Sequence, residues 1–292
     1  MRLPHFEYFA PKTVEEACFL LATHAEKAFP LAGGTDLLVK MKQRKVVPGY
    51  VVNLKGISGM DYITYDEKDG LRIGALATIQ SLKNSIVVKR HCKILATAAG
   101  VESSVQIRNV ATIGGNIANA SPAADAPLAL IVSGASVVLA KADGQREIPM
   151  EAFFTGPGKT VREPGEIIRE IHVPPLPPRT GSAYLKHAMR RTDIAIVSAA
   201  VVLTLTGDAC NDIKIGLGSV APTAFRPRTA ERMLAGKKIT DSSADAAARA
   251  AAEESRPIDD IRGYAEYRAK RVFDITKQAI LQAVQDARLG GI

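Results

Sequence analysis

The sequence predicts an α+β protein of two domains, and three features of the chain support this prediction. The first 55 residues have the pattern of a small β-α-β unit with a glycine-rich turn after its first strand. Four prolines within residues 174–178 interrupt regular structure and suit a linker. Beyond them, three strand patterns precede three helix patterns, as in an antiparallel sheet with helices packed on it. We therefore expect a first domain over residues 1–176, with lobes of about 1–55 and 56–176, and a second over 177–292.

Each element of the first lobe has a local signal. Thr13 and Glu16 form a capping-box pattern before an amphipathic helix that is expected to end near His24. The other elements expected in this lobe are a strand over 28–32, a helical turn over 36–43 and a strand over 50–54.

The remaining elements follow from apolar runs, from alternation and from helical spacing of apolar residues. In the second lobe we expect strands over 70–74, 135–141 and 166–173 and helices over 79–84, 92–99 and 122–132. In the second domain we expect strands over 182–188, 195–206 and 213–220 and helices over 229–235, 241–254 and 263–288.

The composition excludes several classes of protein. The 292 residues are 47% apolar and 23% charged, as in ordinary globular proteins, and the net charge is +8. The basic residues are scattered and not interleaved with aromatic residues, so we expect no nucleic-acid partner. Three widely spaced cysteines argue for a reducing compartment and against an iron–sulfur or zinc site in this chain. The longest apolar run, residues 126–140, is too short to span a bilayer, and no signal peptide is visible, so we expect a cytoplasmic protein without a transmembrane segment.

Two glycine motifs are the candidate binding elements. The first reads AGGTDLL over residues 32–38, where two glycines allow close backbone approach to a ligand and a helix start can face an anion. The second reads TIGGN over residues 112–116 and repeats the design of a hydroxyl, two glycines and a polar side chain. Each is equally explained as a tight turn, but two together suit a diphosphate. Neither is the G-x-G-x-x-G fingerprint or a Walker loop.

Asp125 ends the run NIANASPAAD over residues 116–125, just inside an expected helix start. A carboxylate there can accept hydrogen bonds from a ribose or adenine group. It can equally be a charge that stabilises the N-terminus of the helix, and the residues alone favour that simpler role.

These motifs, taken together, resemble a known family. AGGTDLL and RNVATIGGNIANASPAADAP resemble the FAD-binding medium subunit of the molybdenum hydroxylases, the xanthine dehydrogenase and carbon monoxide dehydrogenase family. The segments FFTGPGKT (153–160) and EIIREIHVP (166–174) are similar to later parts of that flavin domain. SAYLKHAMRRTDIAIVSAA (182–200) and DDIRGYAEYRAKRV (259–272) are similar to its C-terminal domain, so the resemblance covers essentially the whole chain.

The resemblance implies a fold and a set of site residues. The first domain would be a two-lobed FAD-binding domain of the vanillyl-alcohol-oxidase/PCMH type, followed by a small α+β domain with an antiparallel sheet and helices. Both glycine motifs would wrap the FAD pyrophosphate, Asp125 would bind toward the adenosine, Ile168 would pack on the isoalloxazine and Lys186 would place its ammonium near the flavin ring. The implied cofactor-binding residues are Pro30, Leu31, Ala32, Gly33, Gly34, Thr35, Asp36, Leu37, Thr112, Ile113, Gly114, Gly115, Asn116, Asp125, Ile168 and Lys186. From the residues alone, Ile168 is a core position of a strand and Lys186 is a solvated charge.

The resemblance also implies a function. The chain would be the electron-transfer subunit of a complex with a large molybdopterin subunit and a small [2Fe–2S] subunit, passing electrons from the partner clusters through FAD to an external acceptor. None of the five histidines lies in either glycine motif, so we expect non-covalent FAD. Two alternatives remain: a self-sufficient FAD oxidoreductase of the same fold, and an anion-binding module without redox chemistry. Bound flavin would exclude the second, and co-purifying subunits would exclude the first.

Overall fold

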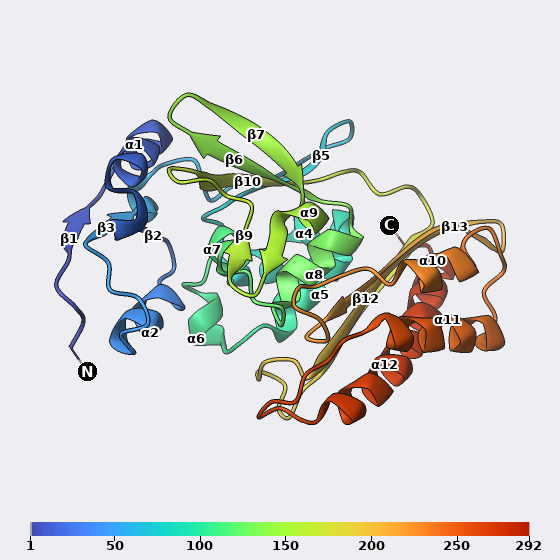
Figure 1. Cartoon of the computed structure of the whole chain (residues 1–292). Coiled ribbons are helices and arrows are strands. Elements are labelled where there is room, and N and C mark those ends of the chain that lie inside the picture. Colours follow the sequence, from blue (N-terminus) through green and yellow to red (C-terminus); the bar gives the residue numbers. More distant parts are fainter. Residues whose placement is uncertain (1, 292) are drawn as a thin grey trace.

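The computed structural model describes residues 2–291, and its first lobe is built on a small parallel sheet (Figure 1). Strands β2 (Ala28–Leu31) and β3 (Tyr50–Asn53) pair in parallel around helix α2 (Leu37–Lys42), which confirms the expected β-α-β unit. A third strand, β1 (Glu7–Phe9), pairs with the other side of β3 and is not visible in the sequence pattern. Helix α1 (Val14–His24) begins as expected, because the Thr13 side chain accepts a hydrogen bond from the Glu16 N–H.

The second lobe is a five-stranded antiparallel sheet in the order β4-β5-β10-β6-β7, with helices against one face. Its strands are β4 (Ile63–Asp66), β5 (Gly70–Gly74), β6 (Ser136–Lys141), β7 (Gly144–Pro149) and β10 (Ile167–Val173). Its helices are α3 (Ile79–Asn84), α4 (Ile86–His91), α5 (Lys93–Val101), α6 (Val105–Arg108), α7 (Ile113–Asn119), α8 (Asp125–Val132) and α9 (Met150–Phe153). The short strands β8 (Phe154–Gly156) and β9 (Lys159–Thr160) form a separate hairpin, and the 3-10 turns η1 (Ala25–Lys27) and η2 (Leu54–Gly56) belong to the first lobe.

The C-terminal part is a three-stranded antiparallel sheet with helices, as the sequence predicts. Its elements are β11 (Thr180–His187), β12 (Val197–Thr206), β13 (Ala209–Gly218), α10 (Arg228–Leu234), α11 (Asp241–Glu254) and α12 (Ala265–Arg288). On one face of this sheet α12 packs against β11 and β12 and α10 against β13, with α11 packed on both helices, and α8 of the preceding lobe packs on the other face. Gly216 permits that packing, since a Cβ there would lie 2.8 Å from side-chain atoms of both Leu128 and Val132.

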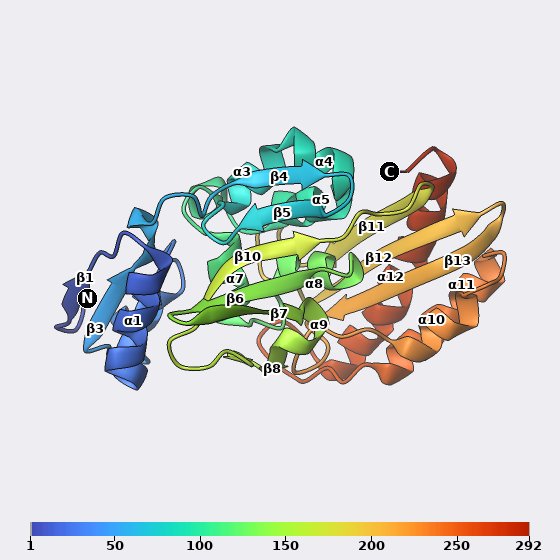
Figure 2. The ribbon, with the colours of Figure 1, turned by 90° about the horizontal axis from the view of Figure 1, so that it is seen from above.

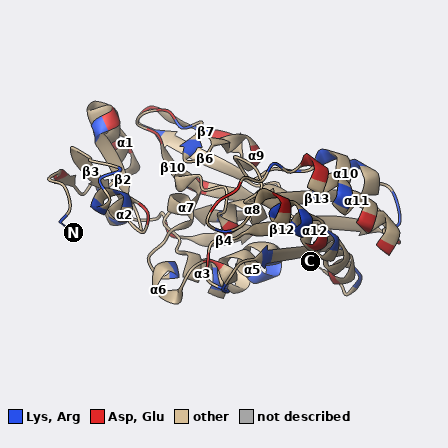
Figure 3. Cartoon of the chain, turned by 60° about the horizontal axis from the view of Figure 1, so that its bottom comes forward, with Lys and Arg blue, Asp and Glu red and all other residues tan. Residues whose placement is uncertain are grey.

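One hydrophobic core therefore runs through the helices of the second lobe to the C-terminal sheet, and a second core lies between that sheet and α11 and α12. Figure 2 shows the first lobe at one end of the molecule and the C-terminal domain at the other. Basic and acidic residues are interspersed over α10, α11 and α12 (Figure 3). The segment between β10 and β11 contains neither helix nor strand, and we keep residue 176 as our proposed domain boundary.

Several expected boundaries are corrected by the structure. The second glycine motif does not form the expected loop, because Ile113–Asn119 form helix α7 with Thr112 as its N-cap. The helix expected over 122–132 begins only at Asp125, because Ala120 takes a left-handed conformation (φ 48°) and a turn follows it. Strands β4 and β7 were not expected, because β4 (ITYD) alternates over only four residues and β7 (GQREIP) is mostly polar.

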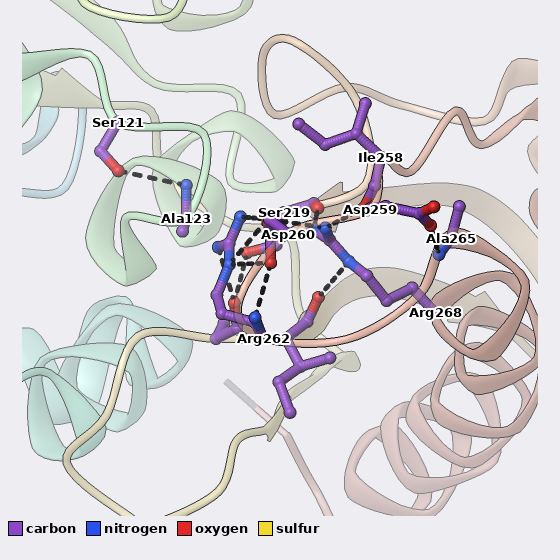
Figure 4. A network of polar contacts seen from close by, with 11 residues as sticks. Ser121, Ala123, Ser219, Ile258, Asp259, Asp260, Arg262, Ala265 and Arg268 are labelled. Carbon is purple, nitrogen blue, oxygen red and sulfur yellow. Dashed lines mark hydrogen bonds and ion pairs between the residues drawn. The ribbon is translucent and has the colours of Figure 1, made fainter.

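A buried arginine fastens the C-terminal domain (Figure 4). Arg268, 1% exposed, donates hydrogen bonds to the backbone carbonyls of Ile196, Ile258 and Ser219 and to the Asp260 carboxylate. Arg262 also binds Asp260, at 2.5 Å from Nη2 to Oδ2. This cluster joins the start of α12 to the ends of β12 and β13, because it satisfies carbonyls that would otherwise lack partners.

We predict that Arg268→Met lowers the free energy of unfolding by on the order of 3 kcal/mol, since three carbonyls and one carboxylate lose a buried donor. Urea denaturation monitored by circular dichroism would measure the change. The matched control is Arg271→Met on the same helix, where an exposed pair with Asp274 is lost and about 0.5 kcal/mol is expected. Equal losses in the two variants would contradict the assigned role of Arg268.

Candidate cofactor site

A pocket of about 500 Å³ lies where the two lobes and the C-terminal domain meet. Fourteen of the sixteen residues expected to bind the cofactor line it: Pro30, Ala32, Gly33, Gly34, Thr35, Asp36, Leu37, Thr112, Gly114, Gly115, Asn116, Asp125, Ile168 and Lys186. Leu31 does not line the pocket, and Ile113 is a fully buried core residue. The tertiary structure thus brings together residues that lie up to 156 positions apart in the sequence, from Pro30 to Lys186.

The turn between β2 and α2 supplies free donors. Within residues 2–291, the backbone N–H groups of Gly33, Gly34, Thr35 and Asp36 make no hydrogen bond, and neither does the Thr35 hydroxyl. Gly34 has φ 75°, a left-handed conformation that glycine adopts without strain. A run of unpaired N–H groups just before a helix is an arrangement that binds phosphate oxygens.

The second motif does not offer such donors, which corrects the expectation that it forms a second anion-binding loop. The N–H groups of Ile113 and Gly114 donate to the carbonyls of Ala77 and Ala75, and the Gly115 N–H donates to Thr112 Oγ1. Gly114 is required for a different reason. A Cβ at this position would lie 2.7 Å from the Ala75 Cβ, so the glycine allows α7 to pack against the segment after β5.

Gly33 brings the two motifs together. A Cβ on Gly33 would lie 2.2 Å from the carbonyl oxygen of Val110, two residues before the second motif. A bridge through Asn119 at the end of α7 reinforces this contact, since Asn119 donates to Asp36 Oδ1 at 3.0 Å and accepts from Lys40 Nζ at 2.6 Å. The Asp36 carboxylate therefore holds α7 in place, and Lys40 and Asn119 are pocket residues that the sequence did not single out.

Asp125 and Lys186 form a buried ion pair. Lys186 Nζ lies 2.8 Å from Asp125 Oδ2, the two side chains are 6% and 5% exposed, and the Tyr184 hydroxyl donates to Asp125 Oδ1 at 2.6 Å. Burial raises the pKa of Asp125, and the Lys186 ammonium and the Tyr184 hydroxyl oppose that rise. The separate roles expected for Asp125 at the adenosine and Lys186 at the flavin ring do not fit this geometry, because groups in direct contact cannot serve opposite ends of an extended dinucleotide.

Glu102, which the sequence did not single out, lies beside this pair. Its Oε1 atom accepts from Asn116 Nδ2 at 2.6 Å, and its side chain lines the pocket. Burial, with a further contribution from the nearby Asp125 carboxylate, raises the pKa of Glu102 to about 8. No local sequence pattern marks this residue, which follows α5 in a bend.

Three side-chain atoms in the pocket wall are buried without a hydrogen-bond partner within residues 2–291: Glu102 Oε2, Asn116 Oδ1 and Arg162 Nε. Buried polar groups normally have partners, so these atoms indicate that a polar ligand completes the pocket. FAD fits the requirement, because its pyrophosphate accepts from free N–H groups and its ribityl and ring atoms offer both donors and acceptors.

Comparison with known proteins identifies the family. Residues 4–176 match the family described as "FAD binding domain in molybdopterin dehydrogenase", and residues 182–283 match "CO dehydrogenase flavoprotein C-terminal domain". The chain belongs to the molybdopterin dehydrogenase medium subunits. It is an FAD-binding oxidoreductase subunit of this family, and the two-domain α+β fold predicted from the sequence is confirmed.

Relatives and solved structures match this medium subunit over nearly its full length. The carbon monoxide dehydrogenase medium chain of Hydrogenophaga pseudoflava is 37% identical over 95% of this chain and 96% of that protein. The xanthine dehydrogenase FAD-binding subunit of Escherichia coli O157:H7 is 31% identical over 96% of each. Carbon monoxide dehydrogenase from Hydrogenophaga pseudoflava superimposes with a TM-score of 0.94 at 37% identity, covering 97% of this chain and 98% of that chain. Quinoline 2-oxidoreductase from Pseudomonas putida 86 does so with 0.92 at 31% identity, covering 98% and 99%.

Neither a membrane span nor a metal-binding cluster is found in the described part of this medium subunit. Among the helices of residues 2–291, none has both the length and the hydrophobicity needed to cross a membrane. The same residues contain no group of three or more histidine, cysteine, aspartate or glutamate side chains placed to hold a metal ion.

We predict that Glu102→Gln makes the subunit more stable at alkaline pH. The folded protein holds a proton on Glu102 between the usual pKa of 4.5 and about 8, so wild-type stability falls as the pH rises through this window. Glutamine removes this decline, and the difference in free energy of unfolding should grow by about 4 kcal/mol between pH 5 and pH 9. Urea denaturation at several pH values would measure it, and a constant difference would contradict the raised pKa.

We predict that Lys186→Met costs about 3–5 kcal/mol of stability, because it leaves the Asp125 charge buried without its partner. The double variant Lys186→Met/Asp125→Asn removes both charges and should recover most of that loss. Thermal or urea unfolding of the two variants measures the coupling. If the second substitution lowers the free energy of unfolding much further instead of restoring it, the two side chains do not act as a pair.

Proposed function

We propose that this medium subunit binds FAD non-covalently in the pocket between its glycine motifs. In a complex with a large molybdopterin subunit and a small [2Fe–2S] subunit, it passes electrons from the partner clusters through FAD to an external acceptor. The observation that supports this most directly is the run of unpaired N–H groups at Gly33, Gly34, Thr35 and Asp36, in the same pocket as the unpartnered side-chain atoms. FAD supplies the ability to accept and donate electrons, and the protein supplies position and electrostatic environment.

The residues divide by chemistry. The turn at Gly33–Asp36 would receive the pyrophosphate, because its donors are free and the start of α2 carries a partial positive charge. Gly114 and Gly115 would form the opposite wall by close packing rather than by donating hydrogen bonds. The buried pair Asp125–Lys186 would present a fixed dipole to the bound group, and Ile168, 6% exposed on β10, would contribute an apolar surface.

The composition of the pocket supports non-covalent binding. No histidine, cysteine or tyrosine, the side chains most often linked covalently to flavins, lines this pocket within positions 2–291. The three cysteines are buried elsewhere in the molecule.

The relatives support the proposed partners. Two of them are a medium chain and an FAD-binding subunit, and one matched structure is that of a carbon monoxide dehydrogenase lacking the Mo-pyranopterin moiety of its molybdenum cofactor. We propose that this chain acts in the cytoplasm in an assembly of the same kind, without a nucleic-acid partner. The match over the whole length of several medium subunits favours this function over the self-sufficient flavoenzyme and over the anion-binding module.

The test is a comparison of FAD binding by the wild-type chain and Thr35→Asp. A carboxylate among the free N–H groups would repel the pyrophosphate, so we expect at least a 100-fold weaker affinity by fluorescence titration. Ser242→Asp, an exposed position in the first turn of α11, is the matched control and should bind like wild type. Acid precipitation of the yellow wild-type protein should release all of its flavin. Equal affinity in Thr35→Asp and wild type would exclude the proposed site, and flavin retained in the precipitate would exclude non-covalent binding.

A further inference from the structure

Glu102 lines the pocket, and its carboxyl group forms no ion pair with a Lys or Arg side chain within residues 2–291. The residue is 9% exposed, and its Oε1 atom is held at 2.6 Å by the amide of Asn116. Its Oε2 atom has no hydrogen-bond partner among the described residues, although it is buried in the pocket wall. An acceptor in this position is costly to leave unpaired, so the structure calls for a partner that the described chain does not provide.

The position of Glu102 is fixed by its backbone. Arg108 Nη1 donates to the carbonyl oxygens of Glu102 and Ser103, at 2.9 and 2.7 Å, and its Nε donates to Gln80 at 2.9 Å. Ser103 has φ 47°, a left-handed conformation that this clamp maintains. The backbone of Glu102 is therefore held in place beside the pocket, and the Asn116 amide holds its Oε1 atom there.

Burial, more than the surrounding charges, favours the protonated form of Glu102. Lys186 is committed to Asp125 at 2.8 Å, and Lys40 is committed to Asn119 at 2.6 Å. Asp125 and Asp36 add negative potential at the Glu102 carboxyl group, whereas the Lys186 ammonium and the nearby backbone N–H of Ala126 lower its pKa; burial is the largest effect, so the pKa stays raised. The Tyr184 hydroxyl donates to Asp125 rather than to Glu102.

The two remaining guanidinium groups do not compensate a charge on Glu102. Arg108 donates to its backbone oxygen and not to its carboxylate, and Arg162 donates to the carbonyl oxygen of Glu166. A buried carboxylate without a cation takes up a proton instead of remaining charged. Consistent with this, burial raises the pKa of Glu102 to about 8.

We propose that Glu102 stands in the pocket as a neutral carboxylic acid whose Oε2–H group donates a hydrogen bond to an acceptor atom of bound FAD. This inference rests on the proposed function and adds to it a specific binding residue and a proton linkage. Since FAD is bound by the protonated form, binding raises the pKa of Glu102 further. The affinity for FAD should be constant below about pH 7 and should weaken by up to about tenfold per pH unit above about pH 8.

The experiment uses the full-length chain with its flavin removed, titrated with FAD from pH 6 to pH 9.5 and monitored by flavin fluorescence. Wild type and Glu67→Gln, an exposed turn residue outside the pocket, should both show the alkaline loss of affinity. Glu102→Gln keeps a neutral donor in the same place, so its affinity should stay within about threefold of the wild-type value at pH 6 and should not change with pH. An alkaline loss that persists in Glu102→Gln would overturn the proposal.

A second measurement does not depend on a variant. Calorimetric titration of the wild-type chain with FAD at pH 8.5, in two buffers of different ionisation enthalpy, gives the number of protons taken up on binding. We expect a net uptake of about three quarters of a proton, the fraction of free Glu102 that is deprotonated at pH 8.5 when its pKa is about 8, and an uptake of zero would overturn the role of Glu102. Binding of FAD with no pH dependence would leave the proposed function intact while removing this inference. Absence of FAD binding at every pH would instead remove the proposed function itself.

Discussion

The buried ion pair between Asp125 and Lys186 is the contact on which the site depends. Asp125 begins α8 in the second lobe, and Lys186 lies near the end of β11 in the C-terminal domain, so the pair joins the two domains at the pocket. Two charges that are almost fully buried are tolerated only when their hydrogen bonds are satisfied, and here Tyr184 and the carbonyl of Val101 complete the set. Because Val101 directly precedes Glu102, the same contact also fixes the pocket wall on the side of that acid.

The pocket has two chemically different walls. One is backbone, where the turn after β2 presents N–H groups that suit a phosphate. The other is made of side chains, where Glu102, Asn116 and Arg162 present single unpartnered atoms that suit the polar groups of a sugar or a ring. This division suits the pyrophosphate of a flavin dinucleotide on one wall and its sugar or ring groups on the other. It also explains why the two glycine motifs, which look alike in sequence, have different roles in the structure.

The C-terminal domain contributes to the site mainly by being rigidly placed. α8 packs on its sheet where Gly216 leaves room, and the Asp260–Arg262–Arg268 cluster fastens the ends of its strands to α12. Arg262 also donates to the carbonyl of Ala195, next to the residues 192–194 that line the pocket. Electron-transfer centres are tuned by small changes in distance and polarity, so such fastening has a functional value beyond stability.

The sequence by itself determined the local elements and the binding motifs. Thr13 with Glu16 marks the start of α1, and the glycines of both motifs mark places of close backbone approach. Fourteen of the sixteen expected site residues line one pocket. Each of them was identified from its own motif or from the family resemblance. The three-residue β1 and the mostly polar β7 escaped detection, since their pairing with β3 and β6 decides that they are strands.

Only the tertiary structure decided which polar groups of the site lack a hydrogen-bond or ion-pair partner. The second glycine motif became the start of α7 because Ala75 and Ala77 accept its N–H groups, and no local pattern shows that the segment after β5 lies there. Asp125 and Lys186 became one pair instead of two separate ligands, because strand pairing places Lys186 beside α8. Glu102 has no motif at all. Its importance comes from burial, from the lack of a cation of its own among residues 2–291 and from the clamp at Arg108, which are properties of the packed molecule and not of any single segment.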